Sequence, residues 1–205
     1  MLENNIATIN HQNVNFVDPG ANSESEKNIF DRLLLEHDHI LGSLNLLELQ
    51  FLDLCRGKTP DYSITRSIIV YVQEYPEQVH HPLEDMIFSI LLERSDEHEF
   101  IQELITEHTQ LEDIARKIRE SIESLNSDME FIGEFKQQLL KFLVGLRQHI
   151  YIEEVDVYPL VQSVLTIKDW NQLHSMIPIL DDPAFGRRTR NDYEYLYREI
   201  KGKCN

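Results

Sequence analysis

Two segments of the sequence each place a histidine four residues before a glutamate, His80 before Glu84 and His149 before Glu153. Residues at this spacing lie about one turn apart on the same face of a helix. An imidazole nitrogen and a carboxylate oxygen placed in this way can reach one metal ion, and both donors suit borderline transition metals such as iron and manganese. The two pairs therefore indicate a metal site.

Long helices are required to present these pairs, and the rest of the sequence predicts them. Apolar residues recur at spacings of three and four with charged residues between them, which indicates an all-α protein. Gly57 is a typical helix terminator, and Thr59-Pro60-Asp61 supplies a cap and an early proline for the next helix. Connections of a few residues make neighbouring helices antiparallel, so we expect an up-down-up-down four-helix bundle. The expected helices span about residues 23–56, 60–94, 96–126 and 127–166.

The remaining segments are expected to add little to this bundle. Residues 1–22 are polar and lack helical periodicity, so we expect a flexible N-terminal tail ahead of one domain over residues 23–205. Two short helices are predicted over residues 168–177 and 189–201, and the turn between them is expected at residues 181–186.

The predicted bundle brings two further histidines to the level of the pairs. His37 lies on the first predicted helix and His108 on the third, and a glutamate precedes each of them. Counted from the connections at a rise of about 1.5 Å per residue, each lies within a few ångströms of the level of a paired histidine in a neighbouring helix. The predicted metal ligands are therefore His37, His80, Glu84, His108, His149 and Glu153.

This ligand set suits a pair of metal ions. If both glutamates bridge, each metal has two histidines and two shared oxygens. An oxo or hydroxo bridge then leaves one position open for a small ligand. These donors suit borderline transition metals such as iron or manganese, and they favour redox chemistry at the metals in place of acid–base catalysis.

The four-helix motif set resembles the hemerythrin-like, or HHE cation-binding, domain family, over about residues 27–200. The resemblance implies a hemerythrin-like bundle with a non-haem di-iron centre that binds O2, nitric oxide (NO) or peroxide, or that stores, senses or donates iron. The motifs that carry the resemblance are Glu36-His37, His80-x-x-x-Glu84, Glu107-His108, His149-x-x-x-Glu153 and Asp182-Pro183-Ala184-Phe185-Gly186.

The sequence departs from the oxygen-carrying hemerythrins, which have His-x-x-x-His on the third helix and an aspartate on the fourth. Here Glu112 follows His108 by four residues, and the fourth helix offers Glu153. Four histidines with two glutamates are closer to the bacterial branch that repairs iron centres, although the cysteine-bearing N-terminal domain often found there is not seen. Three functions stay open: O2 or iron sensing and handling, iron donation or NO and peroxide removal for damaged iron–sulfur centres, and a structural bundle with a non-redox metal. Whether the protein is an enzyme stays open with them.

Several residues near the motifs have competing interpretations. His81 and Asp85 form a second pair one residue later, but the resemblance and the apolar setting favour the pair chosen above. His39 competes with His37 from a different face of the same helix. Glu112 is expected to be solvated or to bond to a ligand, in preference to acting as a seventh ligand.

Other neighbours are expected to have structural roles. Glu36 and Glu107 are interpreted as surface acids, with support of the metal ligands or a place in a proton route as the alternative. Tyr151 and Tyr158 are interpreted as core residues, with gating or proton supply to a bound ligand as the alternative. Pro82 is expected to kink the second helix without ending it. Candidates for the lining of a small-ligand pocket are Phe88, Leu111 and Ile152.

Composition excludes several other classes of function. The 19 Lys and Arg residues against 36 Asp and Glu give a net charge of −17, which disfavours nucleic acids and anionic membranes as partners. No apolar run approaches the roughly 18–20 residues that span a bilayer. No secretory signal is visible, and two cysteines cannot form a disulfide framework, so we expect a cytoplasmic protein.

Overall fold

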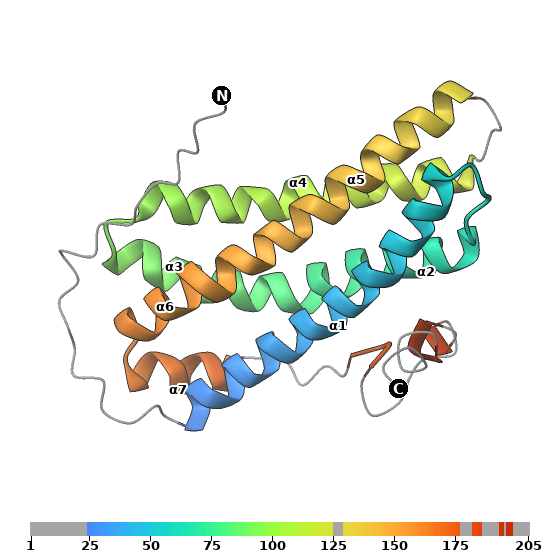
Figure 1. Cartoon of the computed structure of the whole chain (residues 1–205). Coiled ribbons are helices and arrows are strands. Elements are labelled where there is room, and N and C mark those ends of the chain that lie inside the picture. The colour runs from blue at the N-terminus through green and yellow to red at the C-terminus, as the bar shows by residue number, and fades with distance from the viewer. Residues whose placement is uncertain (1–23, 125–128, 177–181, 186–192, 195, 199–205) are drawn as a thin grey trace.

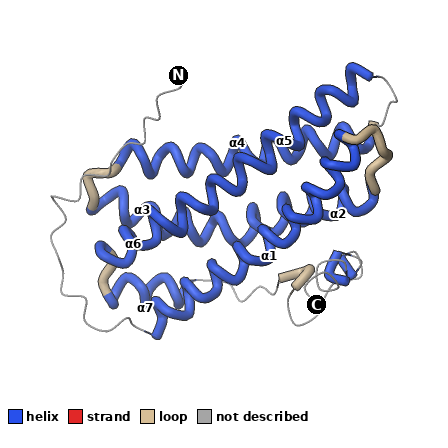
Figure 2. Tube along the Cα trace, in the orientation of Figure 1, coloured by secondary structure: helices blue, strands red, loops and turns tan. Residues whose placement is uncertain are grey.

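The computed structural model describes residues 24–124, 129–176, 182–185, 193–194 and 196–198, and it is all-helical as predicted (Figures 1 and 2). The elements α2, η2 and α3 follow one another without a break, as do α5, η3 and α6, so each run forms one long helix. The predicted tail and most of the predicted helix at 189–201 lie outside the described residues. The elements are α1 (Glu24–Cys55), α2 (Tyr62–Tyr75), η2 (Pro76–His80), α3 (His81–Arg94), α4 (His98–Glu123), α5 (Met129–Ile152), η3 (Glu153–Val157), α6 (Tyr158–Val164) and α7 (Ile167–Met176).

Four long helices form the predicted antiparallel bundle (Figure 1). Helix α1 packs against α2 and α5, and α4 packs against the same two helices, so the four surround a common interior. Helix α7 corresponds to the short helix predicted near residue 170 and packs against α1. Within the described chain, no helix is both long and apolar enough to cross a membrane.

The connection between the first two helices shows how local sequence sets the helix ends. Helix α1 ends at Cys55, and Gly57 follows with a φ of 74°, a left-handed conformation that glycine adopts without steric cost. The cap of α2 is Asp61, whose carboxylate accepts two backbone N–H groups of the first turn. The cap is therefore not Thr59, and Pro60 precedes the helix.

Each of the two continuous helices, α2–η2–α3 and α5–η3–α6, contains a π turn just before a proline. The His81 N–H donates to the Pro76 carbonyl across η2, and Glu153 accepts the equivalent bond across η3. Pro82 and Pro159 follow directly. A proline ring clashes with the carbonyl four residues earlier in a regular helix, and the wider turn relieves that clash. The helix therefore continues through Pro82, as predicted, and the disturbance is taken up by a π turn.

Two apolar clusters fill the bundle, one on each side of its middle. One cluster contains Leu47 and Ile68, and the other contains Phe88 and Trp170, all 1% exposed or less. Burial of each large apolar side chain contributes about 1.5–3 kcal/mol to folding. Between the clusters the interior is polar.

Residues 182–185, here called the C-terminal segment, contact α1 and α2. Asp182 Oδ1 accepts the backbone N–H groups of Ala184 and Phe185, which forms the turn predicted here. Asp182 Oδ2 accepts the Tyr71 hydroxyl at 2.9 Å and lies 3.1 Å from His39 Nδ1. Asp182 thus links the segment to both helices.

Candidate metal centre

The six predicted residues meet in the polar middle of the bundle, and none is more than 7% exposed. Their donor atoms form two groups that share Glu153, and within each group the donors lie within 4.8 Å of one another. The first group contains His37, His80, Glu84 and Glu153, and the second contains His108, His149 and Glu153.

The first group draws its residues from α1, the end of η2, α3 and the start of η3. His37 Nε2 lies 2.9 Å from His80 Nε2 and 3.4 Å from Glu153 Oε2. His80 Nε2 lies 3.5 Å from Glu84 Oε2. Donors at about 2.1 Å from one cation lie roughly 3.0–3.4 Å apart at right or tetrahedral angles. The spacing therefore fits one metal ion.

The second group has the same character. His149 Nε2 lies 2.9 Å and His108 Nε2 3.4 Å from Glu153 Oε1. His108 Nε2 is also 3.6 Å from Glu84 Oε2. Each of the two carboxylates thus approaches imidazoles of both groups, which is the arrangement that a pair of bridged metals requires.

Carboxylates support the outer nitrogens of two of these histidines. His80 Nδ1 lies 2.8 Å from Glu36 Oε2, and His149 Nδ1 lies 2.9 Å from Glu107 Oε2. Each glutamate precedes a site histidine in the sequence but bonds to the histidine of the neighbouring helix. The prediction of a surface acid is therefore wrong for Glu36, which is 4% exposed, and Glu107 has a bonding role at the half-buried edge.

The other two histidines also face carboxylates. His37 Nδ1 lies 2.9 Å from Glu154 Oε1, and His108 Nδ1 lies 3.4 Å from the exposed Asp85. A proton on Nδ1 that bonds to a carboxylate leaves the Nε2 lone pair free to bind a metal. Asp85, the acid of the competing pair His81 and Asp85, therefore faces His108 from outside the two donor groups. Nothing in the sequence spacing singled out Glu154.

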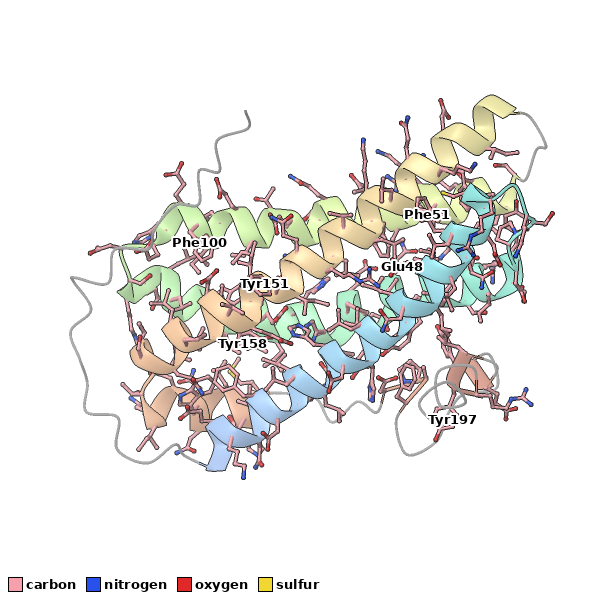
Figure 3. The ribbon with its side chains drawn as sticks, in the orientation of Figure 1. Glu48, Phe51, Phe100, Tyr151, Tyr158 and Tyr197 are labelled. Atoms are coloured by element: carbon pink, nitrogen blue, oxygen red, sulfur yellow. The ribbon has the colours of Figure 1, made fainter. Side chains whose placement is uncertain are left out.

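One tyrosine reaches the centre. Tyr158 donates a 2.7 Å hydrogen bond to Glu84 Oε1, and its ring stacks on His37 with centroids 5.8 Å apart. Tyr151 precedes it along the helix that runs from α5 into α6, and is 62% exposed (Figure 3). The prediction that both tyrosines are core residues is thus wrong for Tyr151. Residues seven apart share a face of a regular helix, but η3 adds one residue between these two and rotates their faces apart.

The metal-free centre balances its charge with protons. Burial alone would lower the pKa of His37, His108 and His149, but neighbouring carboxylates outweigh it and raise the values to about 10, 9 and 10. Burial also opposes the charge of Glu153, yet the facing histidines lower its pKa. Burial and the Glu153 charge raise the pKa of Glu84. Cations bound between these groups would replace the protons.

Several inward-facing atoms have no hydrogen-bond partner among the described residues. These are Glu84 Oε2, Glu153 Oε2 and His149 Nε2, and all three are buried. Buried polar atoms are nearly always satisfied, because leaving one unpaired costs about 1–3 kcal/mol. A metal ion in each group would satisfy all three, so the residues fit a pair of metals.

A small cavity of about 20 Å³ adjoins His37, His80, His149 and Glu153. A volume of this size holds about one water molecule or a diatomic molecule. Leu111 is part of its wall, as predicted, whereas Phe88 and Ile152 pack with the apolar cluster on the other side of the centre. Glu112 also lines the cavity and is outside both donor groups. The remaining apolar wall is formed by Ile40, Val72, Pro76, Ala115, Phe142, Leu146 and Ile150.

His39, the competitor of His37, lies outside the two donor groups, as do His98 and His174. His98 and His174 are exposed, and His39 bonds to Asp182 outside the centre.

In comparison with known families, residues 28–161 match the family described as the hemerythrin HHE cation binding domain. The match covers well over half of the chain and contains all six residues of the two groups. No curated protein matches the sequence.

Proposed function

The chain belongs to the hemerythrin HHE cation-binding domain family, and on this premise we propose a non-haem di-iron protein that binds O2, nitric oxide or peroxide. Its role would be in oxygen or iron sensing or handling. The observation that carries the proposal is the pair of histidine groups around shared carboxylates, next to a cavity of diatomic size. Four imidazole and two carboxylate donors suit iron.

The proposed ligands divide between two iron ions. His37 and His80 would hold one ion and His108 and His149 the other, and Glu84 and Glu153 would supply carboxylate oxygens. Iron held there would supply electron transfer and would bind a small ligand. The metal could also be manganese or zinc, and the experiment below separates these cases.

The surrounding residues have defined tasks in this proposal. The carboxylates that bond to Nδ1 of His37, His80 and His149 orient these imidazoles and keep their Nε2 directed inward. Tyr158 holds one carboxylate oxygen of Glu84 by its hydroxyl. The apolar cavity wall, which includes Leu111 and Phe142, restricts water next to the metals. The cavity thus offers room for a small molecule next to the proposed metal ligands.

Metal analysis of protein purified without added metal or a metal-binding tag tests the proposal, together with absorption spectra under argon and then in air. We expect one iron for each of the two donor groups and charge-transfer bands in the near ultraviolet. His80→Ala should lose both metal and bands. His39→Ala is the matched control, because His39 is half-buried but bonds outside the centre. Zinc without colour in the wild type would contradict the di-iron proposal.

A second candidate function follows from the donor set. Four histidines and two glutamates make up the two groups, and Glu112 is outside them. This donor set resembles that of the bacterial branch that repairs iron centres more closely than that of the oxygen-carrying hemerythrins. In this role the protein would donate iron to damaged iron–sulfur centres, or remove NO or peroxide. Turnover of NO or peroxide, or iron transfer to an apo-cluster protein, would support it. A reversible spectral change with O2 and no turnover would support sensing or handling. A colourless protein whose stability is unchanged after metal removal would instead favour a structural bundle with a non-redox metal.

A further inference from the structure

The centre consists of two halves that repeat the same contacts. The first half comes from α1 and the helix α2–η2–α3, and the second from α4 and the helix α5–η3–α6. In each half, the acid that directly precedes the first histidine bonds to the second histidine of the same half. The acid that directly follows the glutamate of each half faces the first histidine of the other half. The corresponding contacts are Glu36–His80 with Glu107–His149, and Asp85–His108 with Glu154–His37.

The two halves differ at the next residue along the chain. His81 follows His80 in the first half, and Ile150 follows His149 in the second. Both side chains line the same 20 Å³ cavity. An apolar side chain satisfies the packing in the second half, so packing alone gives no reason for an imidazole in the first.

The ring of His81 lies against both donor groups. It stacks on His108 with centroids 4.0 Å apart and an angle of 9° between the planes. It is also steeply inclined to His80 at 5.8 Å and to His149 at 6.5 Å. No hydrogen bond to this ring is formed by any part of the chain that the structure describes. An imidazole carries at least one N–H in every common protonation state, so His81 has a donor to offer.

We propose that His81 donates a hydrogen bond to the small molecule held in the cavity. This inference rests on the proposed function, because it assumes a molecule bound next to the metals. O2, NO and peroxide all present acceptor atoms that an N–H can bond. Gln73 also lines the cavity and has a buried Oε1 without a partner among the described residues. However, Gln73 lies about two helical turns before His80, whereas His81 touches rings of both groups.

Azide binding to the iron-loaded, air-oxidised protein tests this role. In His81→Phe the ring still stacks on His108 but has no N–H, so we expect the Kd for azide to rise about tenfold. The iron content should stay at the wild-type value. His81→Gln should recover part of the affinity, because its amide can donate. His39→Phe is the matched control and should bind azide as the wild type does.

A vibrational measurement supplies a second readout of the same hydrogen bond. The stretching frequency of bound azide should shift between H2O and D2O in the wild type, and His81→Phe, checked to be folded and iron-loaded, should lose this shift. An unchanged Kd in His81→Phe, or an effect in Gln73→Leu alone, would overturn the inference. Loss of iron from both His81 variants would overturn it too, since the residue would then support the metal. A wild type without iron would instead refute the proposed function itself.

Discussion

Glu36 accepts a hydrogen bond from His80 Nδ1 at 2.8 Å, although the glutamate lies on α1 and the histidine at the end of η2. The same carboxylate accepts Arg32 Nε at 2.8 Å and the Tyr75 hydroxyl at 2.7 Å. Burial alone would raise the pKa of Glu36, but these donors lower it to about 2. His80 Nδ1 therefore bonds to a carboxylate that stays negatively charged.

Replacement of this charge should weaken metal binding while every proposed ligand stays in place. In Glu36→Gln the imidazole loses its anionic partner, so we expect metal affinity to fall by about 10–100-fold. Competition with a chelator of known affinity measures the change. Glu48→Gln is the matched control, because Glu48 lies on the same helix and bonds to Arg147 at the surface (Figure 3). Equal affinities in the two variants would show that the charge has no supporting role.

The hydroxyl of Tyr158 should contribute to stability in a way that the hydroxyl of Tyr151 does not. Tyr158→Phe removes the 2.7 Å bond to Glu84, and we expect the free energy of unfolding of the metal-free protein to fall by about 1 kcal/mol. Tyr151→Phe should change it by less than about 0.5 kcal/mol, because Tyr151 is at the surface. Urea unfolding of both variants measures the difference. A larger loss for Tyr151→Phe would contradict the assignment.

Alkaline pH should destabilise the metal-free protein. The pKa values of His37, His108 and His149 are raised from 6.5 to about 10, 9 and 10. The folded state thus binds protons more tightly than the unfolded state. This contribution is complete below pH 6.5 and is lost as pH rises through 9 to 10. The contribution of Glu36 to stability depends on pH in the opposite direction, because folding lowers its pKa from 4.5 to about 2. That contribution is lost as pH falls through this range.

Unfolding by urea at pH 6, 8 and 10 checks this expectation. The metal-free protein should lose stability at each step. The iron-loaded protein should lose less, because cations take the place of the titrating protons. Equal stability of the metal-free protein at pH 6 and pH 10 would show that the three histidines are not held in their protonated form.

The contact of Asp182 with the bundle should stabilise the fold without affecting the metals. Asp182→Ala removes the acceptor for two backbone N–H groups and for the buried Tyr71 hydroxyl, so we expect a loss of about 2 kcal/mol. Iron content should be unchanged. The control Asp53→Ala removes an exposed acid paired with Lys58 and should cost less than about 0.5 kcal/mol. Loss of iron in Asp182→Ala would connect the C-terminal segment to the centre.

The sequence was sufficient to predict the bundle and the meeting of the six residues, because helical spacing and short connections determine both. It was not sufficient to predict which acid supports which histidine. Glu36 and Glu107 act on neighbouring helices, and that depends on how each helix is rotated about its axis. The position of Tyr151 was missed for a related reason. A π turn changes the face of all residues that follow it, and its location is visible from Pro159 only in retrospect.

The polar layer between the two apolar clusters also fixes how the helices align lengthwise. Leu, Ile and Val side chains can interdigitate in several alignments that differ by one turn, or about 5.4 Å. A slip of that size would move the buried Glu84 and Glu153 away from their histidines and against apolar side chains. An unpaired buried charge costs several kcal/mol. The polar layer therefore favours one lengthwise alignment of the helices over the others, even in the metal-free protein.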